Sequence, residues 1–73
     1  MQRLEIMQTD KLKEAIEEEM GKKISNDPDL MEVLEKRATE WEVFQALTYI
    51  VSHKVKMHRQ AYYQRKISKL MNI

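Results

Sequence analysis

The first residues of the chain alternate between polar and apolar types, with Leu4 and Ile6 placed between Arg3, Glu5 and Met7. Alternate side chains of a β-strand point to opposite faces, so Arg3, Glu5 and Met7 would share one face. Arginine can donate two hydrogen bonds to guanine, glutamate can accept one from cytosine, and methionine offers apolar contact. This face therefore has the chemistry to contact base edges in a DNA groove. The simpler alternative is that Arg3 and Glu5 pair with each other on a solvent-exposed face.

A strand over residues 3–7 needs a partner, because unpaired backbone N–H and C=O groups favour association with another chain. The pattern indicates no second strand, so the same strand of a second copy is the expected partner. A two-stranded antiparallel ribbon of this kind fits the major groove of B-DNA. Leu4 and Ile6 would then face the helices of the dimer.

Helical periodicity begins directly after the strand. Thr9 suits the N-cap position of a helix that runs to about Met20. Gly21, the only glycine, follows where a left-handed C-cap residue is expected. The apolar residues spaced along the inner face of this helix are Leu12, Ala15, Ile16 and Met20.

The pair Asp27–Pro28 predicts the N-cap and first residue of a second helix. No glycine or proline follows Pro28, but the apolar face changes direction after His53. We therefore expect a turn near residues 52–54 and a third helix beyond it. The predicted fold class is mainly α, in the order strand, helix, helix, helix.

Residues 41–51 are apolar on nearly every side of a helix. In so small a protein, this pattern indicates that a second subunit covers one side. Homodimerisation would enlarge a core that 73 residues alone keep modest. The predicted dimer core consists of Leu4, Ile6, Trp41, Phe44, Leu47, Val51, Tyr63 and Ile67.

Charge is divided unevenly along the chain. Residues 1–42 hold all 12 acidic and 7 basic side chains, a net charge of −5, whereas residues 43–73 hold 6 basic side chains and no acid. Such a division is typical of a basic surface for nucleic acid or for an acidic partner. The alternative is that the two segments neutralise each other within the fold. The predicted phosphate contacts are Lys22, Lys23, Ser25, Asn26, Lys54, Arg65 and Lys69.

The third helix is basic and amphipathic. It suits packing across the dimer, contact with DNA phosphates, or binding to an acidic membrane surface. Its apolar side carries few aromatic residues, so we favour the first two roles together and expect no membrane partner. His53 and His58 are expected to be ordinary polar surface residues.

Composition argues against several other classes. The chain has no cysteine, so it has no disulfide or thiolate metal site, and no catalytic motif is recognisable. We expect no enzyme, metal, organic cofactor or small-molecule substrate. Without an apolar run long enough to span a bilayer or a signal-peptide pattern, the expected location is the cytoplasm. High charge, one glycine and no cysteine also suit a thermophile.

Two segments, RLEIMQTDKLKEAIEEEMG and ISNDPDLMEVL, resemble the ribbon-helix-helix family of DNA-binding repressors, of the Arc, MetJ and CopG type. The resemblance extends over about residues 2–48. With a basic third helix added, the layout is similar to the elaborated ribbon-helix-helix proteins of archaeal spindle-shaped viruses, which would place the chain inside an infected host cell. It implies a dimerisation and DNA-binding domain over residues 1–51 and an added helix over residues 52–73.

The resemblance also implies roles for individual residues. Arg3, Glu5 and Met7 would contact bases, and the start of the second helix, with Ser25 and Asn26, would hold phosphate. The chain departs from the family where an acid and a methionine stand among the base-contacting residues and where aspartates flank Pro28.

The expected function is therefore sequence-specific binding of double-stranded DNA by a homodimer, as a transcription regulator such as a repressor. The alternative is a helical protein-interaction module, an inhibitor or assembly factor, whose basic third helix binds an acidic partner.

Overall fold

The computed structural model describes residues 9–71, so the predicted strand at residues 3–7 lies outside the described part. The described part is mainly α, as predicted, and contains no β-strand. Its five helices are α1 (Thr9–Met20), α2 (Lys22–Ser25), α3 (Pro28–Glu35), α4 (Glu40–Lys54) and α5 (Met57–Met71).

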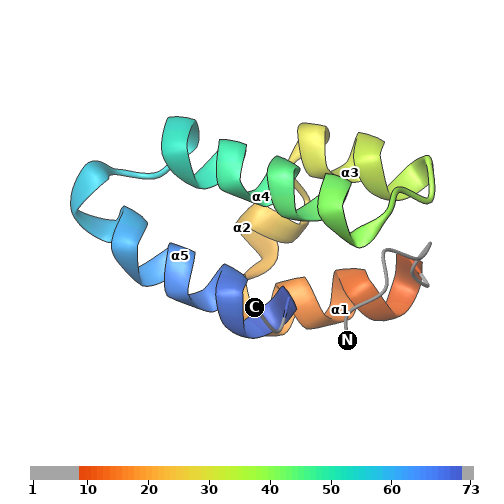
Figure 1. Cartoon of the computed structure of the whole chain (residues 1–73), viewed down its shortest axis with the longest axis horizontal. Helices are drawn as coiled ribbons and strands as arrows, with labels where there is room; N and C mark the ends of the chain where they lie inside the picture. The colour runs from red at the N-terminus through yellow and green to blue at the C-terminus, as the bar shows by residue number, and fades with distance from the viewer. Residues whose placement is uncertain (1–8, 72–73) are drawn as a thin grey trace.

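The helices form two layers with the short α2 between them (Figure 1). α3 packs beside α4 in one layer, while α1 and α5 contact each other in the other layer. α4 and α5 form an antiparallel hairpin that turns at residues 55–56. This turn brings the basic end of the chain against α1 and close to α2.

The predicted first helix is confirmed, except that it starts at Thr9 itself, the expected N-cap, and that Ala15 is only partly buried. Leu12, Ile16 and Met20 are all buried. Gly21 has a φ of 93°, in the region that favours glycine, and no neighbouring atom would meet a Cβ there. The backbone angle rather than space therefore favours glycine at this turn.

The start of α3 is also confirmed. The Asp27 carboxylate accepts a hydrogen bond from the Asp29 backbone N–H at 3.0 Å, and Pro28 is the first helical residue. This contact satisfies one of the N–H groups that every helix leaves unpaired at its start.

The prediction of one helix from Pro28 to about residue 51 is wrong, because the chain breaks between Glu35 and Glu40. Arg37 adopts a φ of 54°, which costs a residue with a Cβ roughly 1–2 kcal/mol. Thr39 then starts α4 with a capping box: its hydroxyl accepts from the Glu42 N–H at 3.3 Å, and the Glu42 carboxylate accepts from the Thr39 N–H at 3.2 Å.

The predicted turn near residues 52–54 lies slightly too early, since α4 continues to Lys54. Val55 is extended, and α5 begins at Met57. Gln60 stabilises this corner by donating hydrogen bonds from its side-chain amide to the carbonyl oxygens of Ser52, at 3.2 Å, and Val55, at 3.0 Å. These are carbonyls that the end of a helix otherwise leaves without partners.

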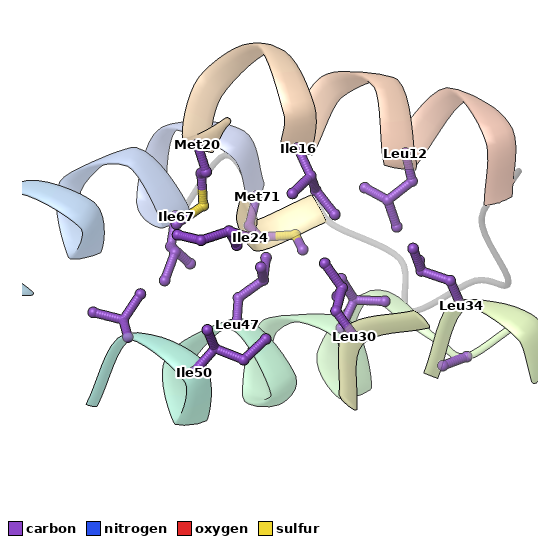
Figure 2. Close-up of a cluster of buried hydrophobic side chains, with 13 residues drawn as sticks. Leu12, Ile16, Met20, Ile24, Leu30, Leu34, Leu47, Ile50, Ile67 and Met71 are labelled. Atoms are coloured by element: carbon purple, nitrogen blue, oxygen red, sulfur yellow. The ribbon is translucent and has the colours of Figure 1, made fainter. Parts of the chain in front are cut away.

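The core is built by all five helices of the described part. Figure 2 shows Ile16 from α1 and Ile67 from α5 directed towards Leu47 from α4. Because Ile67 and Met71 are buried in the same cluster as Leu47, α5 packs into the core shared by the other helices. The expected boundary between residues 51 and 52 falls inside α4.

The residues predicted for the dimer core occupy three environments. Leu47, Val51 and Ile67 are buried within the single chain, while Phe44 and Tyr63 pack partly buried against its core. Trp41 is 51% exposed. Leu4 and Ile6 lie outside the described residues.

Candidate nucleic-acid interface

Of the phosphate contacts predicted near α2, three are at the surface and one is not. Lys22, Lys23 and Asn26 are exposed. Ser25 is fully buried, and its hydroxyl donates a hydrogen bond to the Lys22 carbonyl oxygen at 3.2 Å. Ser25 therefore stabilises the short helix from inside, where a phosphate has no access to its side chain.

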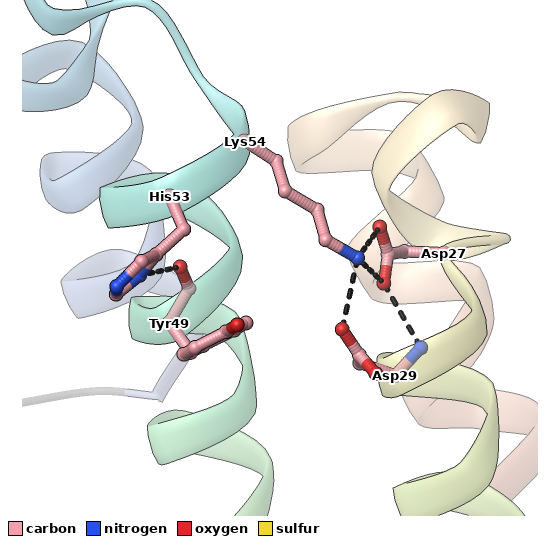
Figure 3. Close-up of polar contacts among 5 residues, drawn as sticks. All are labelled: Asp27, Asp29, Tyr49, His53 and Lys54. Atoms are coloured by element: carbon pink, nitrogen blue, oxygen red, sulfur yellow. Dashed lines mark hydrogen bonds and ion pairs between the residues drawn. The ribbon is translucent and has the colours of Figure 1, made fainter.

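Lys54 reaches from the end of α4 to the start of α3, where two aspartates hold it (Figure 3). Its ammonium lies 2.8 Å from an Asp29 carboxylate oxygen and 3.0 and 2.9 Å from the two Asp27 oxygens. Hydrogen bonds to Asp29 and then to Asp27 raise the pKa of Lys54 above its usual value of 10.5. The charge predicted for DNA is thus neutralised within the fold.

The basic side chains of α5, the predicted third helix, also differ in whether an acid of the fold pairs with them. Lys69 and Lys66 each lie 3.5 Å from a Glu19 carboxylate oxygen on α1. Lys66 also lies over the Tyr62 ring, 5.3 Å from its centroid. Arg65 is exposed and has no ion pair with another described residue. Both forms of the sequence prediction, internal neutralisation and exposed positive charge, therefore occur on one helix.

A groove of about 450 Å³ lies at the corner formed by α2, the end of α4 and the start of α5. We call it the corner groove. Its basic side chains are Lys23, Lys54, Lys56, His58 and Arg59, and its one acid is Asp27. Lys54 is shared by Asp27 and Asp29, so that cluster keeps one negative charge, while Lys23, Lys56 and Arg59 form no ion pair within residues 9–71. The groove therefore concentrates positive charge beside the first turn of α5, where the helix dipole also favours anions.

The corner groove is also lined by apolar residues, which we call its floor: Met20, Ile24, Ile50, Val55 and Tyr63. Met20, Ile24 and Ile50 belong to the buried core, whereas Val55 and Tyr63 are only partly buried. An apolar floor and a cationic rim give the groove two kinds of contact with one ligand.

The sequence prediction missed Lys56 and Arg59 as site residues, although both were visible as basic positions. The missing information was which lysines have their charge offset by Asp27, Asp29 and Glu19. One signal was available: residues 43–73 contain no acid, so any partner of Lys54 has to come from the earlier part of the chain.

α4 presents an aromatic surface on its other side. The rings of Trp41 and Phe44 stack with centroids 5.6 Å apart, and those of Tyr49 and His53 stack at 4.2 Å. His53 also donates from Nδ1 to the Tyr49 carbonyl oxygen at 3.0 Å. His53 therefore has a structural contact, and Trp41 and Tyr49 leave apolar area exposed on this helix.

Within residues 9–71, no cluster of three or more histidine, aspartate or glutamate side chains has the arrangement of a metal site. The base-contacting residues predicted from the sequence, Arg3, Glu5 and Met7, lie outside the described part. No described helix is long and apolar enough to cross a membrane.

No protein-family model matches the chain, and neither a curated protein nor a solved structure matches it.

Proposed function

We propose that the chain binds double-stranded DNA and that the corner groove and the exposed face of α2 contact the phosphate backbone. The observation that supports this proposal is the group of lysine and arginine side chains that line this groove without an acidic partner in residues 9–71: Lys23, Lys56 and Arg59. Lys22, exposed on α2, also has no such partner. A dense array of phosphates attracts such a surface, and each contact releases counterions from the DNA.

The position of these cations also supports the proposal. They come from two elements far apart in the sequence, α2 and the start of α5, and the fold brings Lys23 and Arg59 to the same groove. The acidic residues of α1, in contrast, include the exposed Glu14 and Glu18 on the outer face of that helix. Neither of these two carboxylates lines the corner groove, so they do not offset its positive charge by direct contact.

Base recognition by Arg3, Glu5 and Met7 belongs to the same proposal and is supported by the sequence pattern alone. In this proposal two copies pair their first strands into a ribbon that enters the major groove, as the resemblance to ribbon-helix-helix repressors implies. Phosphate contacts then fix the orientation, and base contacts select the operator, which makes the chain a transcription regulator.

The test is retention of a random duplex pool at about 50 mM and about 200 mM salt, followed by sequencing of the retained DNA. The double variant Lys23→Gln/Arg59→Gln should bind more weakly. The negative slope of log K against log salt should become shallower by about 2, because two phosphate contacts are lost. Lys36→Gln is the matched control, because Lys36 already pairs with Glu32 at 3.1 Å. Equal losses in the double variant and the control would refute the assignment of this surface.

The alternative of a protein-interaction module has its own support in the exposed aromatic surface of α4, where Trp41 is half exposed. Interfaces are enriched in tryptophan and tyrosine. If the duplex pool is not retained at either salt concentration, the protein-interaction function becomes the preferred one. Trp41→Ala should then abolish capture of the partner, and Arg59→Gln should leave the capture unchanged.

A further inference from the structure

We propose that the corner groove binds a nucleoside monophosphate, with the phosphate at the cationic rim and the base against the apolar floor. This proposal goes beyond DNA binding, because a base that is paired and stacked in a duplex cannot reach the floor of a groove. It assigns the chain a small-ligand site that the sequence pattern did not predict.

The rim selects for a phosphate. Lys23, Lys56 and Arg59 line one groove without an acidic partner in the described residues. Several positive charges around one space favour a dianion over a single carboxylate, and arginine matches two phosphate oxygens with parallel hydrogen bonds. Asp27 also lines the groove, but Lys54 holds both of its carboxylate oxygens, at 3.0 and 2.9 Å.

The floor selects for a flat apolar group joined to that phosphate. Val55 and Tyr63 line the groove and are only partly buried, so their surfaces remain available to a ligand. An aromatic side chain next to a cation is a common platform for a nucleobase, because every base has a π-face. An inorganic phosphate would leave this surface in contact with water.

The size of the groove agrees with this ligand class. Its volume of about 450 Å³ lies within the range of small-molecule sites, which runs from about 300 to about 1,000 Å³. The free nucleotide and the unpaired end of a nucleic-acid strand share the same chemistry, and the two sources are separated by experiment.

The experiment is a titration of the full chain, labelled with ¹⁵N, with AMP, adenosine and inorganic phosphate in turn. AMP should saturate with a Kd of about 1 mM or tighter and move the amide signals of residues 54–59. Adenosine and phosphate should each bind about tenfold more weakly, because each occupies only part of the groove. Phosphate binding as tight as that of AMP, or no saturation by AMP, would overturn the proposal.

Two variants locate the site. Arg59→Gln should weaken AMP binding about tenfold, as expected for a lost charge-assisted hydrogen bond. Arg65→Gln removes the same charge from α5 at a position that does not line the groove, and should leave AMP binding unchanged. Equal effects of the two variants would show that AMP affinity depends on the net charge of α5 and not on the groove, which would overturn the proposal.

A phosphorylated tetranucleotide, added to the same sample, identifies the source of the ligand. Binding about tenfold tighter than AMP would assign the groove to a strand end, and equal binding would assign it to the free nucleotide. A parallel titration with duplex DNA separates this proposal from the proposed function. If the duplex binds and AMP does not, the nucleotide proposal fails and DNA binding stands. If AMP binds and the duplex does not, DNA binding fails and the nucleotide proposal stands.

Discussion

The two ends of α5 carry the same kinds of side chain in opposite environments. At its start, Arg59 and the preceding Lys56 line the corner groove without an acidic partner in the described residues, and Met57 is 85% exposed. At its end, Lys66 and Lys69 lie beside Glu19, and Ile67 is 2% exposed. The start of the helix therefore has exposed side chains and cations without an acidic partner, whereas its end packs into the core and forms ion pairs with α1.

The difference shows that the charge of a segment does not equal the charge it offers to a ligand. Every cation of residues 43–73 looks equivalent in the sequence, since that segment has no acid. Folding brings Asp27, Asp29 and Glu19 against three of its lysines and leaves the other cations unpaired within residues 9–71. The surface potential is therefore a property of the tertiary contacts.

The largest effect that distinguishes the two ends is on stability. Ile67→Ala should lower the free energy of unfolding by about 2–5 kcal/mol, because it removes a fully buried side chain and leaves a cavity. Met57→Ala should change it by less than about 0.5 kcal/mol. Urea denaturation followed by circular dichroism measures both values. Similar losses for the two variants would mean that both ends of α5 are equally anchored.

The next effect is on DNA affinity. Arg59→Gln should weaken binding to a duplex about five- to tenfold near 0.1 M salt, as expected for one lost phosphate contact. Lys69→Gln should weaken it less, because Glu19 already offsets part of the Lys69 charge at 3.5 Å. Fluorescence anisotropy with a labelled duplex gives both affinities. A larger loss for Lys69→Gln would place the contact surface at the other end of α5.

Some features of the two ends and of the helix boundaries could be predicted from the sequence, and others could not. Asp27–Pro28 and Gly21 marked helix boundaries because proline, glycine and capping side chains act locally. The break before α4 was missed because Arg37, not glycine, takes the left-handed conformation there. Thr39 and Glu42 carried a local capping-box signal that would have identified it. The contacts of Lys54 and Glu19 depend on tertiary packing, which no local pattern specifies.

A smaller effect should follow from releasing the paired end of α5. Glu19→Gln removes the acid that Lys66 and Lys69 share, so duplex affinity should rise about threefold and its salt dependence should become steeper. The stability lost should be about 1 kcal/mol. Most of it should come from the Lys66 pair, whose lysine is 29% exposed, because solvent screens the pair of the 71% exposed Lys69 more strongly.

Glu14→Gln is the matched control for that experiment. Glu14 is exposed on the same helix and forms no ion pair with another described residue, so its removal changes the net charge without releasing a lysine. If Glu14→Gln raises the affinity as much as Glu19→Gln, the gain comes from net charge alone. The two ends of α5 would then be electrostatically equivalent towards DNA.

The smallest effect concerns Lys54, which lines the same groove as Arg59 but is held by Asp29 and Asp27. Because these carboxylates raise its pKa above 10.5, Lys54 stabilises the fold at every pH below that value. The contribution is lost as the pH rises through the raised pKa of the folded state. The difference in unfolding free energy between the original chain and Lys54→Met should thus be constant near neutrality and shrink in alkali. Tyrosine ionisation is common to both chains and cancels in this difference.

Asp29→Asn sharpens the same measurement. The Asn side chain can no longer attract the Lys54 ammonium by charge. When both chains carry Asp29→Asn, the stability difference that Lys54→Met produces should therefore shrink at a pH closer to 10.5. A difference that persists unchanged into strong alkali would show that the aspartates do not stabilise the fold through the Lys54 charge. Lys54 would then be as available to a phosphate as Arg59, and the contrast between paired and unpaired cations at this groove would disappear.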